Sequence, residues 1–294
     1  MSFAQGPAPL TFRQQTVRQY VFTSIGGQAA RLHFSNQYGT APLTIADVHV
    51  AAVKNEAGDI LAETDHAVTF GGASTVVIPA GGTITSDAVT TVVPARGHLV
   101  VSIYLPDTVS PETLTTHFIS TQHTRWADGD LSSAETFPAE TGGYVPTAYY
   151  FLTGVDVQNP TALGAVVQLG ASITDSQTSS VDKNLRWGND LFTRLQAAGL
   201  EIGVLDQGIP GSDMLHHDDK PIVFTPAAID RFDRDVLSPA GVRWMIYSEY
   251  NDPFDFGKLT SGLLQMMNMA HAQQIRFICS TTPPFLPPHY TQVS

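Results

Sequence analysis

The sequence changes its pattern near residue 158, and this change limits the fold more than any other feature. Up to about residue 155, short runs rich in Val, Thr and Ile alternate with turn residues, as in Arg31–Ser35, Thr75–Ile78 and Leu99–Pro106. Such runs at roughly regular spacing predict an all-β sandwich, and no helical periodicity appears among them. We therefore expect a β-sandwich domain at residues 1–157 and a second domain at residues 158–294.

The second domain alternates predicted strands with predicted helices. Apolar residues at helical spacing predict helices from about Asp190 to Ala198 and from about Leu259 to Gln273. Strand–helix alternation is typical of a parallel sheet with helices on its faces, and ligands of such sheets bind at the carboxyl ends of the strands. The predicted strands are Ala165–Leu169, Glu201–Leu205, Val242–Tyr247 and Arg276–Thr281.

Composition excludes several classes of protein. Hydrophobic residues make up 43% of the 294 residues and charged residues only 14%, which indicates a folded protein and not a disordered one. The formal charge of −12 repels phosphate backbones and anionic lipids, so we expect neither nucleic acid nor a membrane as a partner. No apolar run reaches the ~18 residues that a membrane span needs.

The single cysteine and the first residues bear on compartment. Cys279 excludes an intrachain disulfide and a cysteine-based metal cluster, and its apolar neighbours predict a small buried side chain. The stretch Met1–Pro7 has neither a basic nor an apolar region of a signal peptide, so the cytoplasm is the default expectation. No motif indicates a cofactor or a metal ion.

A polar or glycine-containing motif follows each of the first three strands of the second domain. These motifs are Gly170–Asp175, Asp206–Ser212 and Ser248–Pro253. Ser172, after a strand and a glycine, lies among exposed backbone N–H groups, which favour a nucleophilic hydroxyl and a developing oxyanion. A capping serine is the ordinary alternative at such a position. Each motif alone is a weak signal, whereas their occurrence in order at successive strand ends is a stronger one.

Together these motifs resemble the sequence blocks of the SGNH, or GDSL-type, hydrolases, in particular the branch with a β-sandwich ahead of the hydrolase domain. Gly170–Asp175 matches the family's Gly-Asp-Ser-Ile-Thr-Asp, with Ala171 in place of the aspartate. Gly208–Ser212 resembles Gly-Ile-x-Gly-Asn, and Asn251-Asp252 resembles the Asn-Asp block. The likeness extends over nearly the whole chain.

The resemblance implies a fold and a set of roles. The fold expected from it is α/β: an N-terminal sandwich followed by a three-layer α/β/α, flavodoxin-like domain with a parallel sheet, incomplete at its C-terminus. Ser172 would be the nucleophile, Gly211 would supply a backbone N–H to the oxyanion hole, and Asn251 would supply a side-chain donor. The implied activity is hydrolysis of a carboxylic ester, such as a short acyl ester or an acetylated glycan or metabolite.

The sequence departs from the family's pattern at its general base. The Asp-x-x-His block expected near the C-terminus is absent, since neither His271 nor His289 has an aspartate three positions earlier. The Asp213–His216 stretch has this spacing, but chance supplies such a match in a chain with this many aspartates and histidines. We keep His216 as a candidate substitute base. The alternative is a repurposed, non-hydrolytic member that binds a ligand or promotes a cyclisation or isomerisation.

The expected fold leaves one strand at the edge of its sheet. Arg276–Thr281 would then present a hydrophobic edge, which natural proteins avoid. We expect either a second copy of the chain or the segment Pro283–Pro288 to cover it.

Overall fold

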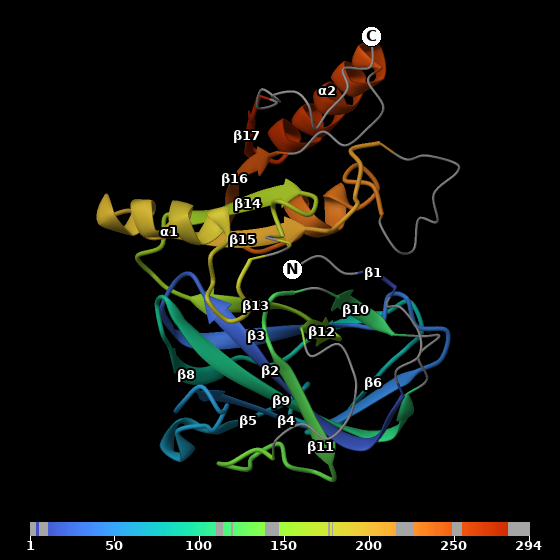
Figure 1. Cartoon of the computed structure of the whole chain (residues 1–294), viewed down its shortest axis with the longest axis vertical. Coiled ribbons are helices and arrows are strands. Elements are labelled where there is room, and N and C mark those ends of the chain that lie inside the picture. Colours follow the sequence, from blue (N-terminus) through green and yellow to red (C-terminus); the bar gives the residue numbers. More distant parts are fainter. Residues whose placement is uncertain are drawn as a thin grey trace.

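The computed structural model describes residues 4–5, 11–109, 114–118, 120–138, 147–175, 177, 179–215, 226–248 and 255–281. Figure 1 shows two parts, a strand-rich part built from β1 to β13 and, above it, four strands with two helices. The chain passes from one to the other between β13 (Leu152–Gln158) and β14 (Gly164–Gly170). The domain boundary expected after residue 157 remains a prediction.

The strand-rich part consists of antiparallel sheets. The long strand β9 (Gly97–Val109) lies between β2 (Phe12–Thr23) and β4 (Leu43–Ala52), and β13 pairs with β3 (Gly27–Ser35). The remaining strands are β1 (Ala4–Gln5), β5 (His66–Val68), β6 (Val76–Ile78), β7 (Thr83–Thr85), β8 (Val89–Val93), β10 (Thr115–Phe118), β11 (Thr124–Asp128) and β12 (Ala148–Tyr150). The segment Ala62–Thr64 forms a single 3-10 turn.

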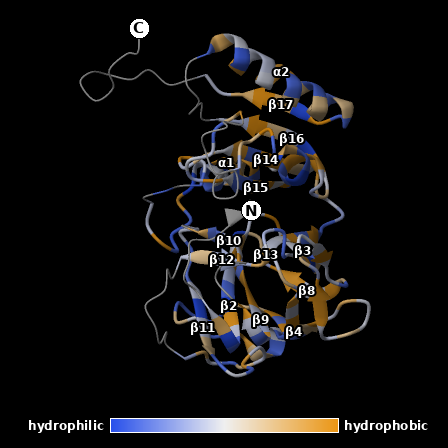
Figure 2. Ribbon diagram, turned by 90° about the vertical axis from the view of Figure 1, so that its right-hand side faces the viewer, coloured by the Kyte–Doolittle hydropathy of each residue, from blue (hydrophilic) through white to orange (hydrophobic). Residues whose placement is uncertain are grey.

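Most buried apolar side chains of these sheets belong to one hydrophobic core, and a smaller cluster of Tyr20, Ala51, Ile60 and Val100 lies apart from it. Along β8, buried Val89, Thr91 and Val93 alternate with exposed residues, because successive side chains of a strand point to opposite faces. Figure 2 shows apolar residues gathered on β8 and also on β16 (Val242–Tyr247) and β17 (Arg276–Cys279) of the other part. Fully buried members of the core include Leu32, Phe34, Ile45, Val101 and Ile103.

The second part contains a four-stranded sheet with parallel pairing. Its strand order is β15-β14-β16-β17, with β15 at Ile202–Gly208. Gly170 of β14 is paired with Gly208 of β15, and Leu169 is paired with Tyr247 of β16. The residues that follow these three strands therefore leave the sheet on the same side, at the carboxyl ends of the strands.

Two helices pack against this sheet. Helix α2 (Phe256–Ala272) buries Leu259, Met266 and Ala270, which are spaced along one face, against Val167, Leu169 and Met245 of the strands. Helix α1 (Trp187–Ala197) buries Phe192 and contacts β15. The helices expected at about 190–198 and 259–273 are confirmed, with starts three residues earlier in each case. No helix within the described ranges is long and apolar enough to cross a membrane.

The expected fold class is wrong. The described residues are mostly β, with 44% in strands and 15% in helices, and they form several antiparallel sheets, so they do not show a three-layer α/β/α domain. The physical reason is a shortage of helices. The described residues between β14 and α1 are turns and bends, and those between β15 and β16 supply a single π-helical turn at Asp233–Leu237. The two helices found among the described residues do not make two complete layers over the four strands.

The outer strand β17 is more exposed than expected for a buried strand. Ile278 is 48% exposed and Cys279 is exposed, so the expectation of a buried cysteine is wrong. Both residues lie on the last strand of the sheet, which pairs only with β16 among the described residues. The segment Pro283–Pro288, expected to cover this edge, lies outside the described residues, and a covering second copy remains a prediction.

Hydrogen bonds join the two parts along the other edge of the sheet. The Ser24 hydroxyl accepts the Val204 N–H (2.9 Å) and donates to the Val204 carbonyl (3.2 Å). Arg234 donates to the Gln37 side chain (2.9 Å). Strand β15 therefore faces the strand-rich part, as Figure 1 also shows.

Candidate functional site

Ser172 lies in the turn directly after β14, an inner strand of the sheet. The Asp175 N–H donates to the Ala171 carbonyl (3.0 Å) and the Gln177 N–H to the Ser172 carbonyl (2.8 Å), which gives the turn helical character. Ala171 is fully buried beneath it, whereas Ser172 is only partly buried. Within the described part of the chain, no group hydrogen-bonds to the Ser172 hydroxyl.

The loop after β15 packs against this turn, and Gly208 is required for the approach. A Cβ atom on Gly208 would lie 2.4 Å from the Asp175 nitrogen and 2.8 Å from the Ala171 oxygen, both backbone atoms. The Ile209 N–H donates to the Gly170 carbonyl (3.2 Å). The structure therefore brings the turn of Ser172 and the loop of Gly211 together at the carboxyl ends of β14 and β15.

Gly211 adopts a φ of +77°, a conformation that side-chain-bearing residues rarely adopt. It is exposed, and its N–H makes no hydrogen bond within the described part of the chain. The next residue, Ser212, is buried and donates to the Pro226 carbonyl (2.8 Å). The hydrogen bond of Ser212 anchors the loop directly after Gly211. Near the carboxyl end of β15, the Gly211 N–H has no acceptor among the described residues.

The third predicted site residue cannot be placed. Asn251 lies outside the described residues, as does the candidate base His216. The last described residue before Asn251 is Ser248, whose hydroxyl is 2.9 Å from that of Thr174 and whose N–H donates to the Leu169 carbonyl (3.1 Å). The strand that leads to Asn251 therefore ends beside the turn of Ser172.

One buried arginine holds these strand ends together. The Arg231 guanidinium donates to the carbonyls of Gln207 (2.7 Å) and Gly170 (2.9 Å) and to the Ser212 hydroxyl (3.3 Å). It also pairs with Asp235 (2.9 Å), and the Arg231 and Asp235 side chains are 1% and 3% exposed. Burial lowers the pKa of Arg231, but arginine stays charged at this depth. A planar fork of donors is needed to reach several acceptors at once.

A buried ion pair links the turn of Ser172 to the strand-rich part. His117 Nε2 on β10 lies 2.8 Å from Asp175 Oδ1, and the two side chains are 4% and 3% exposed. Burial raises the pKa of Asp175 to about 6, because removing a carboxylate from water costs more than its attraction to His117 returns, and the nearby Asp206 raises it further. The pair fixes the position of the turn relative to β10.

A second polar group of residues continues from this pair. Arg186, directly before α1, has its Nε atom 3.3 Å from Asp206 Oδ2 and donates to the Ser120 carbonyl and to the Thr121 hydroxyl (2.8 Å). Burial raises the pKa of Asp206, although Arg186 opposes that rise. These contacts close one side of the junction between the two parts.

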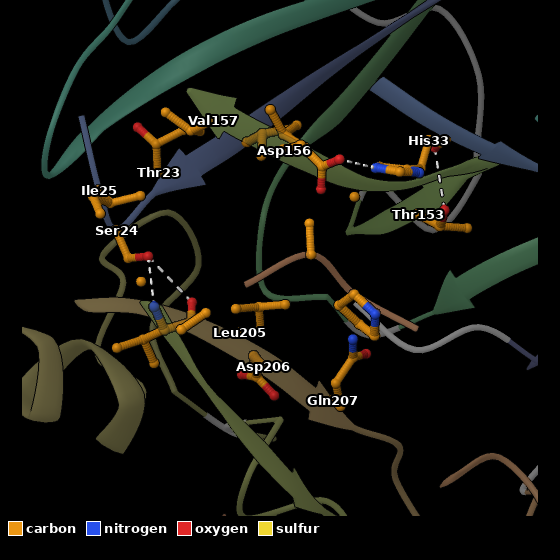
Figure 3. Close-up of a pocket in the computed structure, with 18 of the residues that line it drawn as sticks. Thr23, Ser24, Ile25, His33, Thr153, Asp156, Val157, Leu205, Asp206 and Gln207 are labelled. Carbon is orange, nitrogen blue, oxygen red and sulfur yellow. Dashed lines mark hydrogen bonds and ion pairs between the residues drawn. The ribbon is translucent and has the colours of Figure 1, made fainter. Parts of the chain in front are cut away.

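A cavity of about 660 Å³ lies at this junction. Figure 3 shows its two walls, with Leu205, Asp206 and Gln207 of β15 on one side and the ends and faces of β2, β3 and β13 on the other. On the second wall, His33 Nε2 lies 3.0 Å from Asp156 Oδ2, and His33 Nδ1 lies 3.0 Å from the Thr85 hydroxyl. Thr85 is the cross-strand partner of His33, so these contacts are ordinary side-chain pairs between neighbouring strands.

Sequence reasoning placed Ser172 and Gly211 after neighbouring strands, as the structure has them, but did not identify the polar residues His117, Asp175 and Asp206 near them. The roles of Ser172 and Gly211 remain predictions. Asp175 and Asp206 belong to the motifs that follow β14 and end β15, and both were visible in the sequence. His117 carries no such signal, because it is a single histidine in a strand of the first half and its partner lies 58 residues later. Within the described ranges, no group of three or more His, Cys, Asp or Glu side chains could hold a metal ion.

Comparison with known proteins does not assign the chain to a family. No family model matches the chain, and no curated protein matches it. Among solved structures, the chain is similar to a family two carbohydrate esterase from Clostridium thermocellum in complex with cellohexaose, at 10% identity and a TM-score of 0.32, covering 97% of this chain and 77% of that one.

Two further solved structures are more distant. A putative GDSL-like lipase from Bacteroides ovatus is 11% identical, with a TM-score of 0.23, and covers 93% of this chain and 74% of that one. A family two carbohydrate esterase from Cellvibrio japonicus is 11% identical, with a TM-score of 0.23, and covers 95% of this chain and 87% of that one. At such TM-scores neither the fold nor the activity is inferred from these neighbours.

Proposed function

We propose that the chain is an ester-hydrolase-like protein that acts on a carboxylic ester through Ser172. The observation that carries this proposal is the position of Ser172, partly exposed in the turn after an inner strand, beside a loop whose Gly211 N–H is a free donor. A nucleophilic hydroxyl and an N–H donor at the carboxyl ends of neighbouring strands are two of the groups that acyl transfer needs. Asn251 would add a second donor.

The general base determines whether hydrolysis takes place. A serine hydroxyl is a weak nucleophile near neutral pH without a base, and the oxyanion hole and binding alone retain only ~10³–10⁴ of rate over water. His117, the histidine tied to the turn of Ser172, is engaged with Asp175 at 2.8 Å. His216 or another group outside the described residues would have to serve as the base.

That engagement favours a second candidate function. A site with oxyanion donors and no base can still polarise a bound carbonyl and hold a substrate in a reactive shape. The chain would then bind a ligand or promote a cyclisation or isomerisation without a covalent intermediate. Under this candidate, Ser172→Ala retains function, whereas Asn251→Ala impairs it.

Hydrolysis of a short-chain aryl ester separates the two candidates. If Ser172 is the nucleophile, Ser172→Ala lowers the rate of hydrolysis at least 100-fold. The matched control is Ser261→Ala on α2, because Ser261 is an exposed serine that donates only to the Gly257 carbonyl (2.9 Å), and it should hydrolyse the ester as the unmutated protein does. An unmutated protein with no hydrolysis above the buffer rate would count against the first candidate.

A further inference from the structure

Several residues that line the cavity between the two parts have buried polar atoms without a hydrogen-bond partner in the described part of the chain. Gln168 is 0% exposed, and both its Oε1 and Nε2 atoms lack a hydrogen-bond partner in the described part of the chain. Asp175 Oδ2 and Gln207 Oε1 also lack a hydrogen-bond partner there, and these two residues are 2% and 4% exposed. All three residues line the cavity. Buried polar groups are normally paired, so these atoms retain hydrogen-bonding capacity that the described protein groups do not use.

The unpartnered atoms are mostly hydrogen-bond acceptors. Four oxygens, from Gln122, Gln168, Asp175 and Gln207, are unpartnered acceptors, whereas the Gln168 Nε2 is the one unpartnered donor among these residues. Asp206 Oδ2 adds an acceptor whose only described neighbour is the Arg186 Nε at 3.3 Å, an ion pair without hydrogen-bond alignment. A ligand that completes this set must therefore donate several hydrogen bonds.

The charges around these atoms favour a cation. Burial raises the pKa of Asp175, His117 opposes that rise and Asp206 adds to it, so a positive charge at Oδ2 would favour the carboxylate form. Arg186 is already committed to Asp206 and to two oxygens of the segment Ser120–Thr121. His117 Nε2 lies 2.8 Å from Asp175 Oδ1, whereas Asp175 Oδ2 has no hydrogen-bond partner in the described part of the chain. An additional positive charge beside Asp175 would thus be stabilised.

We propose that this cavity binds the primary ammonium group of a small organic molecule. An ammonium group offers three donors and one positive charge, which matches the acceptors of Gln168, Asp175 and Gln207. The apolar remainder of the molecule would contact Ile25, Phe192 and Leu205, which also line the cavity. Asp175 lies three residues after Ser172, so the ammonium group could belong to the ester substrate. Only this last point rests on the proposed function.

Three ligands that share one butyl chain test the proposal by titration calorimetry with the full chain at pH 7.5. Butylammonium carries charge and donors, butyltrimethylammonium carries charge without N–H donors, and 1-butanol carries a donor without charge. Butylammonium should bind at least tenfold more tightly than either of the others. Equal affinity for 1-butanol would overturn the cationic ligand, equal affinity for butyltrimethylammonium would overturn the donor requirement, and binding of none would overturn the site.

A variant pair locates the binding. Gln168→Met retains the length of the side chain but removes its acceptor, and it should weaken butylammonium binding at least fivefold. Gln265→Met makes the same change at an exposed position of α2 and should bind as the unmutated protein does. Far-UV circular dichroism confirms that both variants fold. Unchanged binding by a folded Gln168→Met would overturn the assignment to this cavity.

Acidification tests the same site without any substitution. Butylammonium stays charged from pH 7.5 to pH 5, whereas Asp175, which is faced by His117, Asp206 and Arg186, takes up a proton with a pKa of about 6. Binding should weaken at least threefold over this range, and pH-independent binding would overturn the role of Asp175. Ser172→Ala should bind butylammonium normally, so an inactive protein that binds it would refute the proposed function alone.

Discussion

Replacing Arg231 by methionine should lower the free energy of unfolding by about 3–5 kcal/mol. Methionine fills much of the space of the arginine stem but donates nothing, so the Gly170 and Gln207 carbonyls lose donors at 2.9 and 2.7 Å. Leaving a buried acceptor unpaired costs ~1–3 kcal/mol each. Asp235 keeps a second partner, the Arg234 Nε at 2.6 Å, so its carboxylate is not left uncompensated. That remaining partner favours the lower end of the range.

Urea unfolding, followed by tryptophan fluorescence and far-UV circular dichroism, measures this loss. The control is Arg276→Met, an exposed arginine on β17 of the same sheet, which should change the free energy of unfolding by less than about 0.5 kcal/mol. Arg231→Lys should fall between the two, because an ammonium group cannot bridge both carbonyls as a planar guanidinium does. If Arg231→Met and Arg276→Met lose equally little stability, Arg231 does not hold the strand ends.

Three other substitutions test the junctions around Ser172. Gly208→Ala should destabilise the protein by ~1–3 kcal/mol and displace the turn of Ser172, whereas Gly203→Ala on the same strand should be tolerated, since its Cβ would meet nothing closer than 3.6 Å; equal urea midpoints for the two variants would contradict the close packing at Gly208. Because the pKa of Asp175 is raised from 3.8 to about 6, the folded chain binds a proton that the unfolded chain has lost, so the free energy of unfolding should fall as the pH rises from about 4 to 6. The fall is at most about 3 kcal/mol for a shift of two units, and Asp175→Asn should remove it; identical pH profiles of the variant and the unmutated protein would refute the shift. Ser24→Ala removes two hydrogen bonds to the edge of β15 and should cost ~1–2 kcal/mol in the same unfolding assay, with an unchanged value showing that Ser24 does not fasten the two parts.

Local sequence patterns predicted individual elements well. The apolar spacing of Leu259, Met266 and Ala270 places these residues on one face, and the structure buries that face. The strand expected at Val242–Tyr247 has those bounds in the structure. These elements depend on residues a few positions apart, and periodicity reports such relations directly.

The layer arrangement could not be read in the same way. The described residues before α1 and before β16 form turns and a single π-helical turn, where the expected fold would place more helix. The position of Ser172 followed from motif order, but the His117–Asp175 pair joins residues 58 positions apart, and nothing in the local sequence of β10 indicates a partner in the other part of the chain. Arg231 is similar, because its acceptors include backbone carbonyls that have no sequence signature.

Covalent labelling by a fluorophosphonate, followed by mass spectrometric mapping of the modified peptide, tests the central claim most directly. The account predicts a single modification on Ser172, lost in Ser172→Ala and retained in Ser261→Ala. Modification of a different residue, or none at a reagent concentration that fully labels a serine esterase, would contradict Ser172 as the nucleophile.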